Sequence, residues 1–483
     1  MQLNETYSRK RYYSTALTRS GRVRTRLKKV VGQMRETEGS IRYPLSAQLT
    51  SCCISEPGGK DMARFVMPMA LRIRGSVDSA ALQGALDDVV ARHESLRTVM
   101  TCGCGDGDAG YQTVLQPAPV PFTEHQLGAG AGKSRDEVAE ELLTTLYAET
   151  MSRFETPLVR AALYRFDDRD AVLTILSHHL AGDAWSTHLL RRDLAAFYRA
   201  RTAGTAPELP PVRQYGEYAL WQQERLSGAK AGTDREYWAG RLAGSQVFAP
   251  PADHPDGIVG AGGAPYGSAT FDFGPQEMSE VRARAREERC STWHVLAAAG
   301  AMLAARISGE TDVTLMTLRA PRDNPAFQDT VGIFVDTLPL RIDLGGCRTF
   351  RDVLLRARST CLEAYRHALP SCILGQEVPD FMEPFGKAKN MPTFFNYSAH
   401  KPANEEIQFA DGVDRVAFRQ EMPLERGGWC IWGMWELPSG GLRSQLEYSP
   451  DRLEAGTADR WINDFRDLIL RITHTPDQTW KDN

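Results

Sequence analysis

The chain has 483 residues, of which 42% are hydrophobic and 24% charged, and its formal net charge is -4 at pH 7. These proportions are those of a globular protein, and the length exceeds one comfortable core, so two lobes are expected. The slightly acidic balance argues against a dedicated nucleic-acid binder. The sequence also shows no apolar run of the roughly 20 residues that a membrane helix needs, and no secretory signal near Met1.

The N-terminal region is strongly basic. Residues 9–29 carry a run of Lys and Arg side chains with no acidic residue between them. We interpret residues 1–40 as an extension outside the folded core, and a docking strip for an acidic partner is the alternative.

The first elements of the globular part follow from periodicity and capping. Residues 78–93 are predicted to form a helix because Leu82, Leu86 and Val89 recur on one face. A capping box at residues 134–137 predicts the start of a second helix. The apolar stretches 158–165 and 171–176 are predicted strands.

Two adjacent histidines follow the second strand. His178 and His179 lie where that strand ends, Asp183 follows four residues later, and Ser186 is the expected N-cap of a helix over 187–200. Side chains alternate along a strand, so the two imidazoles cannot face the same space. One can accept a proton while the other packs or orients it. Asp183 either orients a histidine or pairs with an arginine, and a zinc site would use similar residues.

The second half of the chain repeats the mixed α/β character. Residues 202–211 are rich in Pro and Gly and form the predicted linker, which places an N-terminal lobe at 41–205 and a C-terminal lobe at 206–483. The predicted strands are 270–273, 312–319, 336–342 and 391–397, the predicted helices are 291–307 and 350–367, and 429–448 is a predicted hairpin. Residues 249–268 are either a functional crossover or a disordered loop.

The cysteines indicate a reducing compartment. There are nine of them and no CxxC pair, and an odd count is typical of reduced thiols in a cytoplasm.

Five stretches taken together resemble the condensation domains of nonribosomal peptide synthetases, within the chloramphenicol-acetyltransferase-like superfamily. The active-site signature of that family, HHxxxDG, is matched by His178, His179 and Asp183. The other four stretches follow in the order of the family: SAQ at 46–48, RHESLRT at 92–98, YGEYALW at 215–221 and VGIFVDTLPLR at 331–341.

The resemblance implies a fold and a site. The fold is α/β, with two chloramphenicol-acetyltransferase-like sandwich lobes in a V-shaped pseudo-dimer, the active site at the lobe junction and a tunnel open on both faces. His179 is then the imidazole that takes the proton of the nucleophile or holds the nucleophile in line, with His178 in support. Backbone N–H groups around Gly182 are expected to meet the oxyanion.

Further roles are carried over residue by residue. The resemblance makes Asp183 structural, paired with Arg92 or Arg97. Trp185, Ser186 and Asp336 are expected to line the tunnel. The sequence departs from the family pattern at Ala184, where a glycine usually follows the aspartate, and at Asp336, where the usual residue is asparagine.

The expected function is that of a free-standing cytoplasmic acyltransferase of nonribosomal peptide or antibiotic biosynthesis. It would join an acyl thioester on the phosphopantetheine arm of an acyl or peptidyl carrier protein, supplied in trans, to an amine or alcohol. That nucleophile is a small molecule or is itself carrier-bound. No metal and no permanently bound cofactor are expected. The alternatives are an acyl-CoA-dependent acyltransferase and a non-catalytic platform that recruits partner enzymes.

Overall fold

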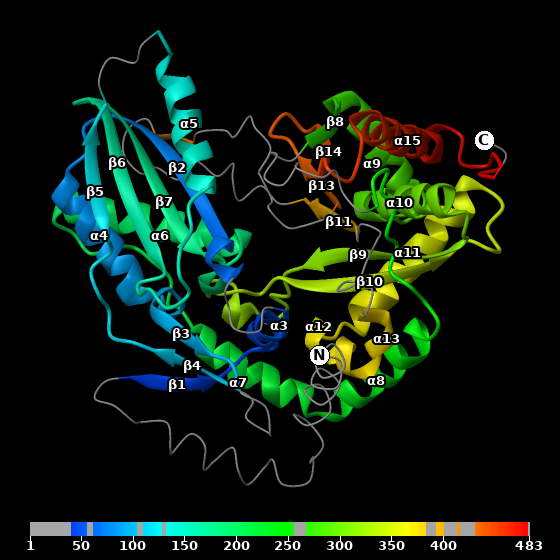
Figure 1. Ribbon diagram of the computed structural model, residues 1–483, viewed down its shortest axis with the longest axis horizontal. Helices are drawn as coiled ribbons and strands as arrows, with labels where there is room; N and C mark the ends of the chain where they lie inside the picture. Colours follow the sequence, from blue (N-terminus) through cyan, green and yellow to red (C-terminus); the bar gives the residue numbers. More distant parts are fainter. Residues whose placement is uncertain are drawn as a thin grey trace. The chain divides into compact units, whose positions relative to one another are not determined.

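The computed structural model describes residues 40–55, 61–103, 110–127, 132–255, 267–382, 393–399, 413–415 and 430–481 (Figure 1). The chain divides into two compact units. The first contains Met1–Lys230, Ala320–Val335 and Glu405–Gln420, and the second contains Ala231–Arg319, Asp336–Asn404 and Glu421–Asn483. The predicted extension at residues 1–40 lies, apart from Ser40, outside the described residues, as does the middle of the stretch 249–268.

The first unit is built on two sheets. The larger has the strand order β12-β2-β7-β6-β5 and the smaller has the order β1-β4-β3. The strands of the larger sheet are β12 (Val413–Arg415), β2 (Val66–Arg74), β7 (Asp170–His178), β6 (Val159–Asp167) and β5 (Phe122–Gln126). Those of the smaller sheet are β1 (Ile41–Pro44), β4 (Tyr111–Val114) and β3 (Thr98–Thr101).

Helices cover both faces of the larger sheet. The helices of this unit are α3 (Ala47–Ser55), α4 (Ser79–Arg92), α5 (Arg135–Tyr147), α6 (Ala184–Ala203) and α7 (Tyr215–Leu226), with 3₁₀ turns η1 (Asp61–Arg64), η2 (Glu94–Arg97), η3 (His179–Ala181) and η4 (Pro325–Phe327). Helices α4 and α6 pack together over one face, and α5 covers the other (Figure 1).

Strand β7 is apolar along most of its length because both of its faces are covered. Leu173 and Ile175 belong to the core shared with α4 and α6, whereas Val172 and Leu176 pack in the cluster that contains α5. The same alternation turns the last residue of the strand, His178, toward the α5 face. The strand therefore ends on His178, and His179 follows as the first residue of η3.

The second unit contains one six-stranded sheet with the order β10-β9-β11-β13-β14-β8. Its strands are β10 (Asp336–Asp343), β9 (Asp312–Arg319), β11 (Thr393–Ser398), β13 (Cys430–Glu436), β14 (Leu442–Tyr448) and β8 (Gly267–Phe273). Its helices are α8 (Ala229–Leu242), α9 (Pro275–Glu287), α10 (Thr292–Ser308), α11 (Phe350–Arg366), α12 (Ser371–Glu377), α13 (Pro379–Met382) and α15 (Ala455–His474).

Local sequence signals are confirmed in both units. Asp78 caps α4 by accepting bonds from two backbone N–H groups, and the capping box of Ser134 and Glu137 opens α5 with both of its bonds. Helix α10 is buried nearly all round, and β13 and β14 form the predicted antiparallel hairpin. These elements formed where predicted because capping and turn chemistry act within a few residues.

The predicted linker at 202–211 does not mark the division between the units. The first unit continues through α7 to Lys230 and also includes a later stretch, Ala320–Val335. A hydrogen bond from Arg92 to the carbonyl of Pro210 holds the end of the predicted linker, and Gln214, just beyond the linker, donates to the carbonyl of Arg92. A Pro-rich composition therefore marked an ordered connection within one unit.

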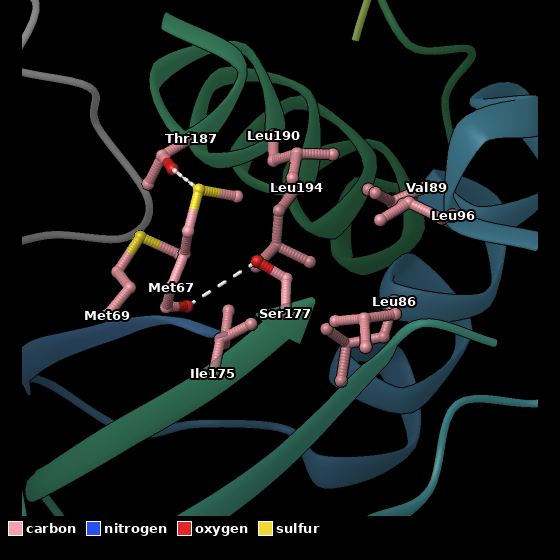
Figure 2. A pocket seen from close by; sticks show the side chains of 11 residues that line it. Met67, Met69, Leu86, Val89, Leu96, Ile175, Ser177, Thr187, Leu190 and Leu194 are labelled. Atoms are coloured by element: carbon pink, nitrogen blue, oxygen red, sulfur yellow. Dashed lines mark hydrogen bonds between the residues drawn. The ribbon is translucent and has the colours of Figure 1, made fainter. Parts of the chain in front are cut away.

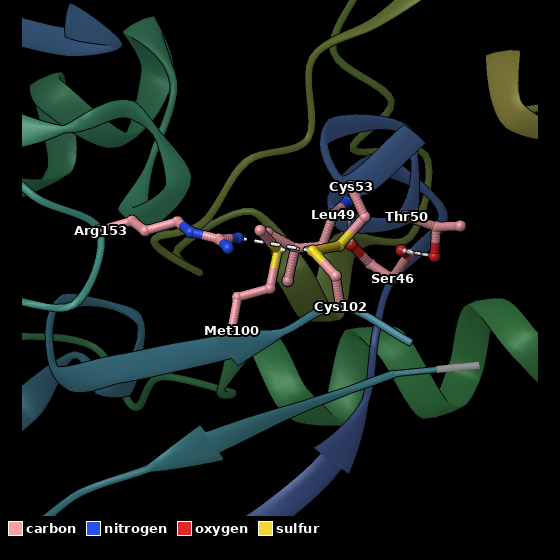
Figure 3. The surroundings of a disulfide bond; sticks show 7 residues. All are labelled: Ser46, Leu49, Thr50, Cys53, Met100, Cys102 and Arg153. Atoms are coloured by element: carbon pink, nitrogen blue, oxygen red, sulfur yellow. Dashed lines mark hydrogen bonds between the residues drawn. A yellow bond between two sulfur atoms is a disulfide. The ribbon is translucent and has the colours of Figure 1, made fainter. Parts of the chain in front are cut away.

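The expectation that all nine cysteines are reduced thiols is wrong. Cys53 on α3 and Cys102, the residue after β3, form a disulfide bond (Figure 3). Nη1 of Arg153 lies 3.4 Å from Sγ of Cys102. The two cysteines are 49 residues apart, and no local spacing pattern predicts such a pair.

Among the described helices, none combines the length and the apolar character that crossing a membrane would require.

Candidate active site

The first histidine of the motif is locked inside the protein. His178 ends β7 opposite Val66 of β2, and its side chain is fully buried. Nε2 lies 3.0 Å from the carbonyl oxygen of Met62, and Nδ1 accepts a bond from the backbone N–H of Leu180 at 3.1 Å. Because Nδ1 accepts this bond, the ring proton is on Nε2, which donates a hydrogen bond to the carbonyl of Met62. Burial lowers the pKa of His178 to about 4, and the ring is neutral near pH 7.

The second histidine has a different environment. His179 begins η3, and its side chain is only half-buried. Its backbone N–H donates to the carbonyl oxygen of Phe65 at 2.7 Å. The imidazole stacks on the phenyl ring of Phe65, with 4.2 Å between ring centroids and 7° between the planes. His179 is therefore the imidazole of the pair that solvent reaches.

Asp183 is an anchor between two distant parts of the chain. Its side chain is almost completely buried, at 2% exposed. Oδ2 accepts the backbone N–H of Phe334 at 3.1 Å, and Oδ1 accepts the N–H of Ser186 at 2.9 Å and Nη2 of Arg322 at 3.1 Å. The structural role expected of Asp183 agrees with this geometry.

The expected partners of Asp183 are wrong, because Arg322 pairs with it instead. Arg92 forms an ion pair with Asp193, and Arg97 donates to backbone carbonyls, among them those of Val90 and Leu115. Arg322 is 139 residues from Asp183 in the sequence. Nothing in the local pattern around the motif points to it.

Arg322 also ties its own segment together. Its Nη1 donates to the carbonyls of Phe327 and Thr330 at 3.1 and 2.7 Å, and its guanidinium lies 3.9 Å from the centroid of the Phe334 ring. Burial lowers the pKa of Arg322, but a guanidinium still stays charged at neutral pH.

The helix after the motif begins earlier than predicted. Asp183, not Ser186, is the N-cap of α6, since its carboxylate accepts the N–H of Ser186. Ser186 is fully buried, and its hydroxyl lies within 3.1 Å of Asp183 Oδ1 and of both polar backbone atoms of Gly332. The expectation that Ser186 lines a substrate tunnel is therefore wrong.

The N–H of Gly182 itself, one of the predicted oxyanion donors, is engaged elsewhere. The backbone N–H of Gly182 already donates to the carbonyl of His179 at 3.3 Å, within the turn η3. The positive end of α6 is occupied as well, by the carboxylate of Asp183. The N–H groups of Gly182 and Ser186 are therefore already used, and a part for the other N–H groups around Gly182 stays a prediction.

Three of the other motifs meet next to Asp183. Tyr215 of α7 is buried, its hydroxyl donates to the carbonyl of Ile333 at 2.5 Å, and the same hydroxyl lies 2.7 Å from Oγ of Ser46. A side chain at Gly332 would overlap the ring of Tyr215, so this close approach requires glycine. The stretches 46–48, 215–221 and 331–341 thus share one buried network.

A narrow apolar pocket of about 30 Å³ lies beside the motif (Figure 2). It is enclosed by β2, β6, β7, α4 and α6 and the turn η2, and its lining residues are Met67, Met69, Leu86, Val89, Leu96, Val159, Ile175, Ser177, Thr187, Leu190 and Leu194. Thr187 donates to the carbonyl of Asp183, so the pocket wall is joined to the motif. Its size and lining suit one small apolar group.

No metal cluster is found within the described ranges: no group of three or more His, Cys, Asp or Glu side chains there is placed to hold an ion. At His178 both ring nitrogens are used in hydrogen bonds inside the protein, so this histidine is not available as a zinc ligand.

Comparison with known proteins identifies the family. The family described as Condensation domain matches residues 58–374. The chain belongs to the condensation domain family. Its relatives include the isonitrile lipopeptide synthase of Mycobacterium tuberculosis, 34% identical over 439 residues, and the malpinin synthetase of Mortierella alpina, 29% identical over 424 residues. Each alignment covers 86% of this chain, but only 17% of the first relative and 5% of the second.

Solved structures share the fold of this condensation domain. The SgcC5 protein of Streptomyces globisporus, solved with (R)-(-)-1-(2-naphthyl)-1,2-ethanediol and sucrose, is 31% identical, with a TM-score of 0.75 over 90% of this chain and 100% of that chain. The X-domain from teicoplanin biosynthesis also has a TM-score of 0.75, at 22% identity, over 93% of this chain and 98% of that chain.

The two departures from the family pattern have local explanations. Ala184 is the first residue of α6, where alanine is favoured and no left-handed conformation is needed. Asp336 begins β10 and is buried, and its carboxylate accepts the backbone N–H groups of Ser371 and Thr337 at 3.2 and 2.8 Å. Burial raises the pKa of Asp336.

The remaining tunnel residues of this condensation domain stay predictions. Trp185 is half-buried, and its Nε1 donates to the carbonyl of Gln328 at 2.9 Å. Its part in a tunnel, and that of Asp336, are expectations that follow from the resemblance alone.

Sequence reasoning missed Met62 and Phe65 as well as Arg322. The first two lie between the stretches at 46–48 and 92–98, where no motif was recognised. They come to the site because β2 pairs with β7, which sets Val66 opposite His178.

Proposed function

We propose that this chain transfers an acyl group from a phosphopantetheine thioester on a carrier protein to an amine or alcohol, with His179 as the catalytic residue. The carrier would supply the donor in trans, and the product would be an amide or ester of nonribosomal peptide or related specialised metabolism. Membership of the condensation domain family supports the reaction class.

The difference between the two histidines carries this proposal. His178 is fully buried, neutral and hydrogen-bonded through both ring nitrogens. His179 follows it directly but is half-buried, with its backbone and its ring plane both held. An oriented and accessible imidazole suits the acceptance of a proton near neutral pH.

The reaction balances without a further reagent. The nitrogen or oxygen of the nucleophile attacks the thioester carbonyl, and its proton passes to His179. The C–S bond then breaks, and the leaving thiolate of the carrier arm recovers that proton. General-base assistance typically contributes about 10²- to 10⁴-fold in rate, and alignment of the nucleophile adds to it.

The relative SgcC5 supports an alcohol as one nucleophile class. At 31% identity over 100% of that chain, it was solved with a 1,2-diol that carries a naphthyl group. An alcohol and an amine both lose a proton on acylation, so the same imidazole can serve either of them.

Intact-mass analysis of acyl-loaded carrier proteins tests the proposal. The protein is incubated with a candidate carrier and either a diol or an amine, and the carrier loses the mass of its acyl group when transfer occurs. We expect His179→Ala to slow transfer by about 10²- to 10⁴-fold. His125→Ala, at an exposed histidine of β5 in the same unit, is the matched control and should leave the rate unchanged.

The same assay separates the alternatives. Faster transfer from acyl-CoA than from the carrier would favour the CoA-dependent acyltransferase. Transfer at the wild-type rate by a folded His179→Ala protein would overturn the catalytic assignment and favour the non-catalytic platform.

A further inference from the structure

The short segment that precedes β2 contacts both histidines of the motif. The carbonyl of Met62, in η1, accepts the ring proton of His178 at 3.0 Å, and the carbonyl of Phe65 accepts the backbone N–H of His179 at 2.7 Å. The N–H of Met151 donates to the carbonyl of Ala63 at 2.7 Å, and this bond ties the segment to a part of the chain beyond the motif's own strands.

Phe65 makes a second, different contact with the same histidine. Its ring lies parallel to the His179 imidazole, at 4.2 Å and 7°, and meets the ring of His178 edge-on at 6.4 Å and 77°. The phenyl ring is itself half-buried, so it forms one wall against a half-exposed imidazole. Backbone and side chain of one residue thus hold two parts of His179.

We propose that Phe65 is a positioning residue for His179, fixing the backbone of that histidine through its carbonyl and the plane of the imidazole through its ring. This inference rests on the proposed function, because it assigns Phe65 a part in the same proton transfer.

The chemistry of imidazole explains why the ring plane matters. The lone pair that accepts a proton lies in the plane of the ring, so rotation about the side-chain bonds moves its direction away from the nucleophile. A flat aromatic face in van der Waals contact restricts this rotation, whereas an aliphatic side chain of similar volume would not. Misplacement by about 1 Å can lower a rate 10²-fold.

Three variants test the inference. Phe65→Leu keeps the carbonyl and most of the volume but removes the flat face, and Phe65→Tyr keeps the face. Phe122→Leu alters a half-buried phenylalanine on β5 of the same sheet and serves as the matched control. For each protein, kcat and KM for acyl transfer are measured, together with the thermal midpoint and the NMR signals of the histidine ring protons, assigned with His179→Ala.

We expect Phe65→Leu to lower kcat about tenfold or more, with KM nearly unchanged. The ring protons of His179 should lose the shielding of the stacked phenyl and move downfield. Phe65→Tyr should retain both the rate and the shielded signal, and Phe122→Leu should affect neither.

Two results would overturn the inference. One is an unchanged kcat in Phe65→Leu. The other is a fall in kcat that accompanies lost stability while the His179 signal stays in place, because Phe65 would then act on folding alone. Failure of the proposed function is separate: it would appear as full activity in His179→Ala, whatever Phe65→Leu does.

Discussion

Adjacent residues of one motif have opposite relations to solvent. His178 is fully buried, whereas His179 is half-buried one residue later. The sequence predicted only that the two imidazoles face different spaces; in the structure β7 ends at His178 and His179 begins the turn η3. The sequence could not predict what holds each ring, because Met62 and Phe65 reach the motif only through the pairing of β2 with β7.

The buried imidazole makes folding stability depend on pH. Burial lowers the pKa of His178 to about 4 in the folded protein, against about 6.5 in the unfolded chain. Between these values only the unfolded state takes up the proton. Stability from this group is therefore complete above about pH 6.5 and is lost as the pH falls toward 4, by about 3 kcal/mol in all. Urea unfolding of the wild type and of His178→Gln over this range should show a shallower pH dependence in the variant.

Other histidines contribute to the same acid range, so the comparison needs a control. Burial also lowers the pKa of His294, to about 4, and that contribution remains in His178→Gln. His125→Gln changes an exposed histidine of the first unit and should leave the pH dependence as in the wild type. Equal slopes for wild type and His178→Gln would contradict the assignment of His178 as a neutral buried group.

At the scale of elements, the turn between β7 and α6 is fixed by packing. Gly182 has extended backbone angles, with φ at -173°, which any residue can adopt. Yet a Cβ at this position would lie 2.8 Å from Cβ of Ser186 and 3.3 Å from Cε of Met67. Ser186 has little freedom to move away, because its hydroxyl is bonded to Asp183 and Gly332.

We therefore expect Gly182→Ala to lower the free energy of unfolding by about 1–3 kcal/mol, the usual effect of overpacking. Gly232→Ala is the matched control. It lies in α8, where a Cβ would have no atom within 4 Å, and it should raise stability by about 0.5–1 kcal/mol, because alanine favours the helix. Urea unfolding of both variants measures the two changes. A Gly182→Ala protein as stable as the wild type would show that the turn can relax.

Elements with local signals were predicted well, and their long-range partners were not. The helix α4 followed from the spacing of Leu82, Leu86 and Val89. The start of α6 was placed too late, because both Asp183 and Ser186 are good N-cap residues and only the fold decides between them. The disulfide between Cys53 and Cys102 and the ion pair of Asp183 with Arg322 each join segments far apart in sequence, and spacing within one sequence cannot reveal such pairs.

For the whole molecule, each folded unit is built from segments that are not continuous along the chain. The first unit also includes Ala320–Val335, and this stretch supplies Arg322 and Phe334, which bind the carboxylate of Asp183. Composition placed the boundary near residue 205 because Pro and Gly gather there, whereas the division depends on which segments lie against one another in the folded units. The five motifs of the family are accordingly spread over both sides of the predicted boundary.

This arrangement predicts that residues 40–230 do not fold by themselves. Without 320–335, the buried carboxylate of Asp183 loses Arg322 and the N–H of Phe334, and Tyr215 loses its acceptor at Ile333. Removing one partner of a buried ion pair typically costs about 3–5 kcal/mol, a large share of the roughly 5–15 kcal/mol by which a domain is stable. Near-UV circular dichroism and urea unfolding should show no cooperative transition for this fragment. The same fragment joined through a flexible Gly/Ser linker to residues 320–335 should regain one. A fragment 40–230 that unfolds cooperatively with a native-like spectrum would mean that the N-terminal segments alone hold the motif. The contacts of Arg322 and Phe334 with Asp183 would then not be needed for folding.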